Sequence, residues 1–237
     1  MGKRIAVVQS SYIPWKGYFD LINSVDEFVL YDDAQFTRRD WRSRNRIKTA
    51  QGPHWLSVPV EVSGQYLQAI KETKIADPAW KRRHWATIRH SYARAPYFAQ
   101  YETFLENLYA AAPSDLLSSA NYWFLTQLCT LLGIQTKFSW SMDYAMIGDR
   151  TERLAAICTQ AGATEYLSGP SAKAYLDPTV FDRRGILLRF VDYSGYPEYS
   201  QLHGAFDHAV SIIDLVLSVG PEAGRYMRSI SHEDQSR

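Results

Sequence analysis

Short apolar runs alternate with helical patterns in the first part of the chain. The uninterrupted apolar runs at 4–9 and 27–32 are typical of strands that are covered on both faces. Between these runs, apolar residues recur at helical spacing from Tyr18 to Val25. Because strand, helix and strand follow one another within roughly thirty residues, the pattern predicts a β-α-β unit with parallel strands and a right-handed crossover.

The middle of the chain changes to long helical patterns. After a strand pattern at 54–60, helical spacing continues through three consecutive segments, 78–98, 98–112 and 114–134. We expect these helices, at about 78–133, to form a cover or sub-domain.

Strand and helix patterns alternate again in the last part of the chain. The strand patterns are at 136–140, 165–169 and 186–193, and the helical patterns are at 149–162, 178–185, 211–220 and 221–230. The sequence therefore predicts an α/β fold, with a mostly parallel sheet flanked by helices and a helical insertion in the middle of the chain. We expect one domain over residues 1–230 and a flexible polar tail at 231–237.

Composition narrows the class of protein. The 237 residues are 46% hydrophobic, which is enough to bury the core of a domain of this size. The 26 Lys and Arg nearly balance the 25 Asp and Glu, so the net charge does not indicate a nucleic-acid or membrane partner. Only a local patch of basic residues could bind one. Two cysteines, Cys129 and Cys158, fit a reducing compartment. The first apolar run is too short for a signal peptide or a membrane span, so we expect a bacterial cytoplasmic protein without a membrane partner.

Polar and aromatic residues follow the first two predicted strands. In open parallel sheets, ligands bind outside the carboxyl ends of the strands. The first strand leads to Gln9 and the loop from Ser10 to Trp15, and the second leads to Asp32, Asp33 and Gln35. We expect these groups to meet at one edge of the sheet. The aromatic side chains Tyr12, Trp15 and Tyr18 then either line a pocket there or pack in the core.

The acidic pair Asp32 and Asp33 has two interpretations. Neighbouring carboxylates act as a general base with a positioning group, or bind a divalent cation, because their mutual repulsion raises one pKa. An Asp-Asp pair after a strand is also a common turn signal. We favour the catalytic interpretation.

A basic run at 36–48 leaves the same predicted edge. It contains the six cations Arg38, Arg39, Arg42, Arg44, Arg46 and Lys48 but a single acid, Asp40. Such runs are usually solvated, but Trp41 and Asn45 lie between the arginines, and arginine side chains suit a nucleotide diphosphate or an RNA backbone. A second basic cluster at 80–85 would extend this surface.

Two later loops add candidate binding residues. Ser168, Gly169, Ser171 and Lys173 follow a predicted strand and can donate hydrogen bonds to a phosphate, although the spacing is not that of a P-loop. The loop at 194–206 adds Tyr199, Gln201 and His203, and His203 is a candidate general base unless it is incidental. The six histidines lack the spacing of a zinc site, so we predict no metal, and no particular cofactor is indicated.

Six segments resemble the WbqC-like protein family: "YIPWKGYFDLI", "FVLYDDAQF", "WRSRNRIK", "WLSVPV", "YLSGPSAKAYLD" and "SIIDLVLSVG". The resemblance spans nearly the whole chain. One position departs from the family, which usually has Pro after the Gln of the first strand, where this chain has Ser10. The family occurs in bacterial gene clusters for surface polysaccharides and specialised metabolites. It therefore implies a group-transfer enzyme that moves an acyl or aminoacyl (glycyl-like) group to an amine.

Under this hypothesis the acceptor is a small molecule that carries phosphate, such as a nucleotide-linked sugar, and the donor is a thioester, an acyl phosphate or an aminoacyl-tRNA. The catalytic candidates are Asp32, Asp33 and His203. The binding candidates are Gln9, Tyr12, Trp15, Tyr18, Gln35, Trp41, Arg44, Asn45, Arg46, Ser168, Gly169, Ser171, Lys173, Tyr199 and Gln201. One alternative is nucleotidyl or adenylyl transfer, although the loop Pro14-Trp15-Lys16-Gly17 lacks the two histidines of that superfamily. Another is a non-catalytic ligand-binding partner. The sequence indicates no oligomeric state.

Overall fold

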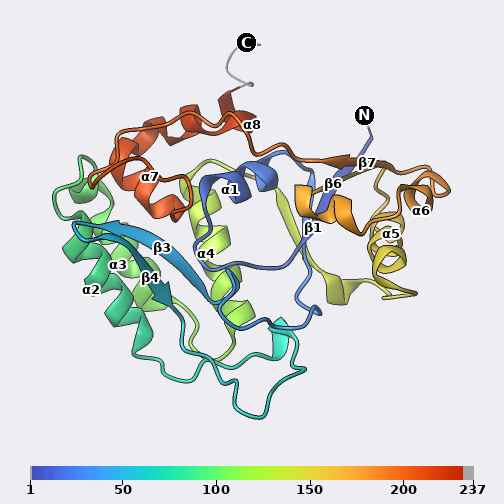
Figure 1. The fold of residues 1–237 in the computed structure, drawn as a ribbon, viewed down its shortest axis with the longest axis horizontal. Coiled ribbons are helices and arrows are strands. Elements are labelled where there is room, and N and C mark those ends of the chain that lie inside the picture. The colour runs from blue at the N-terminus through green and yellow to red at the C-terminus, as the bar shows by residue number, and fades with distance from the viewer. Residues whose placement is uncertain (1, 232–237) are drawn as a thin grey trace.

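The computed structural model describes residues 2–231 and contains a five-stranded parallel sheet (Figure 1). Its strands are β1 (Arg4–Val8), β2 (Glu27–Leu30), β5 (Lys137–Trp140), β6 (Glu165–Ser168) and β7 (Leu187–Phe190), in the order β5-β2-β1-β6-β7. Numbered within this sheet along the chain, the order is 3-2-1-4-5, as in doubly wound nucleotide-binding folds. The predicted α/β fold and its first β-α-β unit are confirmed.

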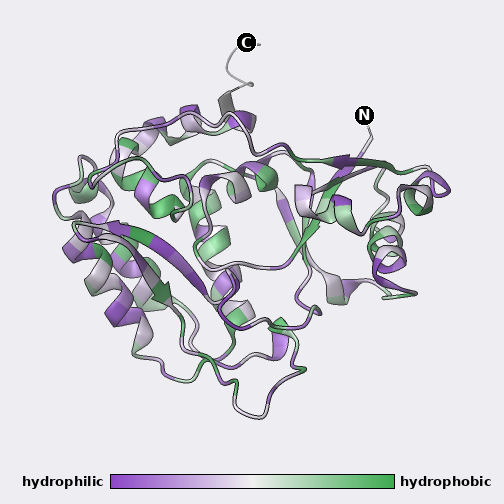
Figure 2. Ribbon diagram, viewed as in Figure 1, coloured by the Kyte–Doolittle hydropathy of each residue, from purple (hydrophilic) through white to green (hydrophobic). Residues whose placement is uncertain are grey.

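The two faces of the sheet pack against different helices. Alternate residues point to opposite faces, so Ala6, Phe28 and Leu30 enter the larger hydrophobic core, while Ile5 and Val29 enter a smaller one. Figure 2 shows hydrophobic residues concentrated on these central strands. The larger core lies against α1 (Lys16–Asn23), α4 (Leu117–Leu131) and α7 (Ile212–Val219), and the smaller against α5 (Arg150–Gln160) and α6 (Pro178–Asp182).

The helical middle of the chain is divided: α4 packs on the main sheet, whereas the two helices before it pack beside a two-stranded hairpin. Helices α2 (Trp80–Tyr92) and α3 (Phe98–Ala111) lie next to the antiparallel strands β3 (Arg44–Thr49) and β4 (Gly52–Ser57), on the opposite side of the molecule from α5 and α6 (Figure 1). Strand β4 begins two residues before the predicted segment. Strand β3 falls within the basic run, where the sequence predicted no strand.

The remaining elements are short. The single turns of 3-10 helix are η1 (Ile70–Glu72), η2 (Ser141–Asp143) and η3 (Pro170–Ala174). The helix predicted at 221–230 is instead η4 (Gly220–Tyr226) followed by α8 (Arg228–Ser231). The backbone φ of Gly220 is 59°, which ends α7, and Gly224 then disfavours a regular α-helix. The predicted tail lies outside the described residues from 232 onward.

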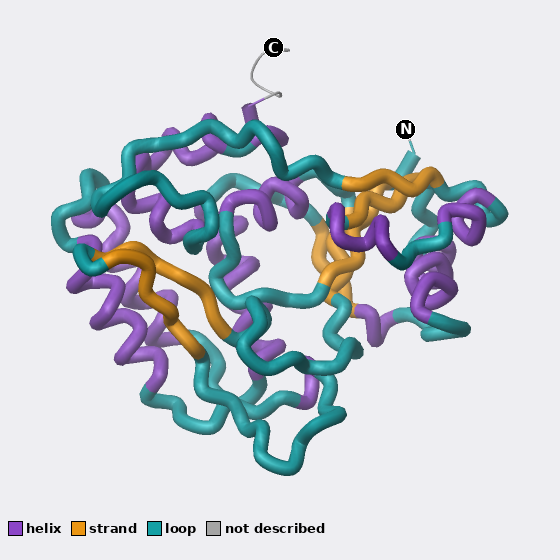
Figure 3. The backbone as a smooth tube through the Cα atoms, in the orientation of Figure 1, coloured by secondary structure: helices purple, strands orange, loops and turns teal. Residues whose placement is uncertain are grey.

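A buried carboxylate joins three strands at the amino end of the sheet. The Glu27 side chain is fully buried and pairs with Lys3 at 2.7 Å and Lys137 at 3.1 Å. It also accepts hydrogen bonds from the hydroxyls of Ser139 and Tyr144. Burial alone would raise the pKa of Glu27, but these partners outweigh it and lower the pKa to about 2. Helices α1 and α4 lie between the sheet and the hairpin, and long loops run past them (Figure 3). Among residues 2–231, no helix is both long and apolar enough to cross a membrane.

Candidate functional site

The loop after β1 is fixed by a buried carboxylate from β2. Asp32 is fully buried and accepts hydrogen bonds from the Ser10 backbone N–H at 2.8 Å and from the Ser10 hydroxyl at 2.7 Å. It also accepts a hydrogen bond from the Ser118 hydroxyl of α4. Burial raises the pKa of Asp32, and these donors and Arg42 oppose that shift. The predicted meeting of the first two strand ends is therefore present, and Asp32 connects them to α4.

The same loop holds a strained residue. The backbone φ of Ile13 is 35°, a conformation that is unfavourable for a β-branched residue, and its side chain is fully buried. Hydrogen bonds fix the residue before it, because the Tyr12 N–H donates to the Trp41 carbonyl at 3.1 Å and the Tyr12 carbonyl accepts from Asn45 Nδ2 at 3.1 Å. Such strain persists only where the surroundings determine the backbone, as they do at many binding sites.

Tyr12 itself is a core residue. Its hydroxyl hydrogen-bonds to His84 Nδ1 at 2.9 Å and to the Tyr109 hydroxyl at 2.8 Å. His84 Nε2 faces the Ser57 carbonyl at 3.2 Å, and since a carbonyl can only accept, Nε2 carries the proton and Nδ1 is the acceptor. Burial lowers the pKa of His84 to about 4, so this histidine is neutral at pH 7. Tyr12, predicted to bind substrate, therefore supports the loop from within.

A pocket of about 400 Å³ opens beside this loop. Its wall combines the loop after β1, the start of α1, the basic run and the segment before α7. The lining residues are Ser11, Pro14, Trp15, Tyr18, Trp41, Arg42, Asn45, His208 and Ala209, and we call this cavity the Trp15 pocket. Four predicted binding residues, Trp15, Tyr18, Trp41 and Asn45, thus share one cavity. A volume of this size fits a small organic ligand.

The position of the Trp15 ring depends on Gly17. The indole packs edge-on against Tyr193 and Tyr196, with ring centroids 5.1 and 5.5 Å away. It also lies on the backbone of Gly17, where an added Cβ would be only 2.3 Å from Trp15 Cζ2. Gly17 is therefore required for this placement of the ring.

Tyr18 and Arg42 converge on the end of β1. The Tyr18 hydroxyl and Arg42 NH1 both donate to the Gln9 carbonyl, at 2.8 and 2.9 Å. Burial raises the pKa of Tyr18, so its hydroxyl stays protonated. Arg42 also pairs with Asp40 at 3.5 Å, and among the described residues its buried Nε makes no hydrogen bond. The Gln9 carbonyl thus holds two residues of the pocket wall, although Gln9 itself does not line the pocket, and Arg42 brings a positive charge to that wall.

His208 is a pocket residue that the sequence did not single out. Its ring packs edge-on against Phe206, with centroids 4.5 Å apart. Partial desolvation and the nearby Lys16 ammonium lower the pKa of His208 below its ordinary value. Lys16 is itself buried; it donates to the Pro197 carbonyl at 2.5 Å, and burial lowers its pKa to about 8. His208 is therefore an exposed, neutral imidazole at the pocket wall.

The other catalytic candidates lie outside the pocket lining. Asp33 pairs with Lys71 at 2.5 Å and accepts from the Ser141 hydroxyl at 2.5 Å. His203 Nε2 donates to the Ser91 carbonyl at 2.8 Å, behind the hairpin. Asp32 and Asp33 follow one another at a strand end, so their side chains point to different surroundings.

Three further binding candidates, Arg46, Gln201 and Tyr199, hold the segment that carries His208, and a fourth, Arg44, lies on the hairpin. Arg46 Nε donates to the Ala209 carbonyl at 2.9 Å and pairs with Asp207 at 3.4 Å. The Gln201 side chain accepts from Lys48 Nζ at 2.8 Å and from the Asp207 N–H at 2.9 Å. Tyr199 donates to the buried Asp214 at 2.8 Å, and Arg44 stacks on Trp55. Arg46 and Gln201 therefore hold the chain on either side of His208 without lining the pocket themselves.

The remaining candidates lie on two separate loops. Gln35 is exposed and donates to the Tyr66 carbonyl at 2.8 Å. The residues Ser168, Gly169, Ser171 and Lys173 follow β6 at the carboxyl edge beside β1, but they do not line the Trp15 pocket. Lys173 Nζ lies 5.5 Å from the Phe190 ring. Their predicted phosphate contacts stay a prediction. Within residues 2–231, no three His, Cys, Asp or Glu side chains form a metal-binding group.

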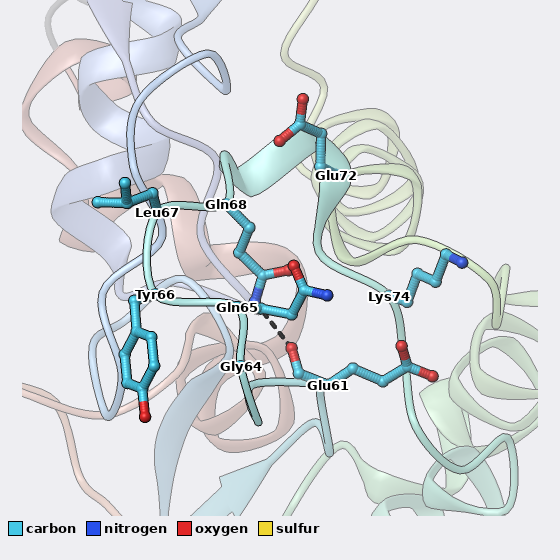
Figure 4. Close-up of a pocket in the computed structure, with 8 residues that line it drawn as sticks. All are labelled: Glu61, Gly64, Gln65, Tyr66, Leu67, Gln68, Glu72 and Lys74. Atoms are coloured by element: carbon cyan, nitrogen blue, oxygen red, sulfur yellow. Dashed lines mark hydrogen bonds between the residues drawn. The ribbon is translucent and has the colours of Figure 1, made fainter.

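A second pocket, of about 540 Å³, lies on the loop between β4 and α2 (Figure 4). Its lining includes Glu61, Glu72 and Lys74, and Gln68 Nε2 donates to the Glu61 carbonyl at 2.7 Å. Figure 4 shows Tyr66 and Leu67 pointing away from these charged groups. This pocket is larger than the Trp15 pocket, but it contains no residue that the sequence singled out.

Comparison with known proteins agrees with the motifs quoted above. The WbqC-like protein family matches residues 9–226, which include both walls of the Trp15 pocket. A relative in Mycobacterium tuberculosis, described as an uncharacterized protein, is 50% identical over 226 residues, covering 95% of this chain and 98% of that protein. No solved structure matches the chain. The chain belongs to the WbqC-like protein family.

Proposed function

We propose that this protein is a group-transfer enzyme that acylates the amine of a phosphate-bearing acceptor held in the Trp15 pocket. The observation that carries the proposal is the presence of a guanidinium, Arg42, and a neutral imidazole, His208, on the wall of one aromatic pocket. Family membership supports a role in bacterial polysaccharide or specialised-metabolite biosynthesis.

The pocket wall favours a ring-containing, anionic ligand. Trp15, Tyr18 and Trp41 offer flat apolar surfaces on which a sugar or a base can stack. Arg42 offers charge-assisted hydrogen bonds, and among residues 2–231 no Asp or Glu lines the pocket to oppose a phosphate. Asn45 lies at the base of the wall, where its amide also holds the strained loop.

His208 supplies the proton acceptor that amine acylation requires. The acceptor ammonium gives a proton to His208, and the resulting amine attacks the carbonyl carbon of the donor. A carbon–nitrogen bond forms, the bond from the acyl carbon to its oxygen or sulfur breaks, and the leaving group takes a proton from the imidazolium. The new amide nitrogen then gives its second proton to His208, which releases that proton to water. The donor is a thioester, an acyl phosphate or an aminoacyl-tRNA. Asp32 serves this chemistry indirectly, by anchoring the loop that carries Trp15.

The test is mass spectrometry of the acceptor after reaction. Purified protein is first analysed for retained ligands, and then incubated with amino-sugar nucleotides and the three donor classes. A mass increase that matches the acyl group, absent with the hydroxyl analogue of the acceptor, supports the proposal. We expect His208→Gln to lower turnover by about 10²- to 10⁴-fold, because glutamine cannot take the proton.

Two further variants sharpen this assignment. His203→Gln changes the same residue type in the same segment but outside the pocket, and His90→Gln on the exposed face of α2 is the neutral control. Loss of turnover with His203→Gln, and not with His208→Gln, would restore the assignment made from the sequence. Tight acceptor binding without turnover by the unaltered protein would instead indicate a non-catalytic binding partner.

The strand order favours one second candidate, nucleotidyl or adenylyl transfer. In sheets of this order a nucleotide binds between the first and fourth strands, here β1 and β6, where Ser168 and Gly169 lie. This reaction would release pyrophosphate from a nucleoside triphosphate in the presence of magnesium. Absence of pyrophosphate with a panel of triphosphates and acceptors would remove this candidate.

A further inference from the structure

Two tryptophans are exposed side by side at the mouth of the Trp15 pocket. Trp41 and Trp55 are 40% and 39% exposed, and their ring centroids are 5.2 Å apart. Trp55 lies on β4, opposite Arg46 of β3. Trp41 also lines the Trp15 pocket, whereas Trp55 does not. The aromatic surface of the pocket therefore continues outward onto the hairpin.

Two arginines accompany this pair. The guanidinium carbon of Arg44 lies 4.0 Å from the Trp55 ring centroid, and that of Arg46 lies 5.7 Å away. Among the described residues, the buried Arg44 Nε makes no hydrogen bond. Arg46 is also paired with Asp207, so in the free protein both guanidinium groups already lie beside the Trp55 ring. We call Trp41, Arg44, Arg46 and Trp55 the hairpin platform.

The charge around the hairpin platform is positive. Arg38 and Arg39 are exposed on the loop that leads into β3, and the backbone φ of Arg39 is 57°. The single acid of the basic run, Asp40, is engaged by Arg42. Exposed aromatic rings beside arginines are the arrangement by which proteins bind unpaired bases and the phosphates between them. A peptide or lipid surface would not require two rings fixed by guanidinium groups.

We propose that the hairpin platform binds single-stranded RNA, with unpaired bases stacking on Trp41 and Trp55 and phosphates contacting Arg44 and Arg39. The inference rests on the proposed function in one respect. The platform meets the Trp15 pocket at Trp41, so a bound 3′ end would deliver an aminoacyl ester to the acceptor amine. Among the three donor classes, this selects aminoacyl-tRNA.

Binding of a labelled oligonucleotide tests the platform separately from turnover. The probe is a fluorescein-labelled single-stranded RNA of about eight nucleotides, which suits the site sizes of stacking platforms. It is titrated by fluorescence anisotropy, with the same sequence as duplex RNA for comparison. We expect the single strand to bind more tightly than the duplex. Two to four phosphate contacts would give a slope of log K against log salt of about −1.4 to −2.8.

Trp55→Ala is the decisive variant because Trp55 does not line the Trp15 pocket. We expect it to weaken RNA binding about tenfold to a hundredfold, while retention of the amino-sugar acceptor stays unchanged. Tyr175→Ala is the matched control. Tyr175 is 43% exposed, has the Arg150 guanidinium carbon of α5 3.5 Å from its ring centroid, and lies between η3 and α6. Helices α5 and α6 lie on the opposite side of the molecule from the hairpin (Figure 1).

Each outcome decides the inference. Equal loss with Trp55→Ala and Tyr175→Ala, equal affinity for duplex and single strand, or no RNA binding would each overturn it. Binding of single-stranded DNA as tightly as RNA would refute the assignment to RNA. If the hairpin platform does not bind RNA but the acceptor is acylated from a thioester or an acyl phosphate, the proposed function stands and the RNA-binding inference is refuted. If RNA binds but no acceptor is acylated, the proposed function fails alone.

Discussion

Replacing Asp32 separates an anchoring role from a catalytic one. Asp32→Asn keeps the size of the side chain but removes the charge that three hydrogen bonds from Ser10 and Ser118 meet. A hydrogen bond to a charged group contributes about 1.5–3 kcal/mol. In the variant, the amide hydrogens of the new Asn side chain face the Ser10 and Ser118 hydroxyls, which are themselves donors in this site, so donor meets donor. Losing one or two such bonds in a fully buried place lowers the free energy of unfolding by about 2–5 kcal/mol.

Urea unfolding followed by tryptophan fluorescence measures this change. Because a protein of this size loses about 2–4 °C of Tm per kcal/mol, a parallel thermal melt should shift by about 4–20 °C. Asp33→Asn is the matched control: its carboxylate is 20% exposed and pairs with Lys71, so we expect a loss of about 1 kcal/mol or less. If Asp32→Asn unfolds at the same urea concentration as the unaltered protein yet abolishes turnover, the anchoring role is refuted and the catalytic role predicted from the sequence is supported.

Three further predictions follow from other parts of the structure. Gly17→Ala should displace the Trp15 ring and weaken acceptor binding, measured by calorimetry, because the new Cβ has no room; unchanged affinity would contradict the close approach. Glu27 should stabilise the fold fully above pH 4.5 and progressively less as pH falls towards 2, because its folded pKa lies below its unfolded one. Urea midpoints between pH 7 and pH 3 should therefore fall less steeply in Glu27→Gln than in the unaltered protein. If His208 is the base, turnover should be constant around pH 7 and fall only below pH 6.5. A fall in turnover on the acid side with its midpoint above pH 7 would exclude His208 as the base.

The periodicity of the chain predicted the main sheet and strand β4, but not β3, the other strand of the hairpin. Strands β1 and β2 are buried apolar runs, so their pattern is unambiguous. In β3, long cations alternate with the buried Asn45 and Ile47, and this period of two is hidden because arginines dominate the composition. The charge that suggested a phosphate site also concealed strand β3.

The sequence singled out some of the residues that line the Trp15 pocket, such as Trp15 and Tyr18, but not His208. The end of β1 and the aromatic loop could be placed because strand topology brings them to a known edge. The choice between His203 and His208 depends on the path of an irregular segment, which no periodicity encodes. Likewise, Tyr12 and Trp15 are three residues apart, yet the strained backbone at Ile13 sends one into the core and the other to the pocket.

Two lysines from the N-terminal part of the chain donate hydrogen bonds to the segment before α7, and these contacts affect how the protein folds during its synthesis. Lys16 reaches the Pro197 carbonyl across 181 positions of sequence, and Lys48 reaches Gln201 across 153. A ribosome-bound chain can form β1, α1 and the hairpin long before His208 has emerged from the exit tunnel. Until then, two lysines that are buried in the finished protein remain in water, and the cavity lacks one side. The newly made protein should therefore acquire ligand affinity abruptly, at the last stage of synthesis, rather than in proportion to its length.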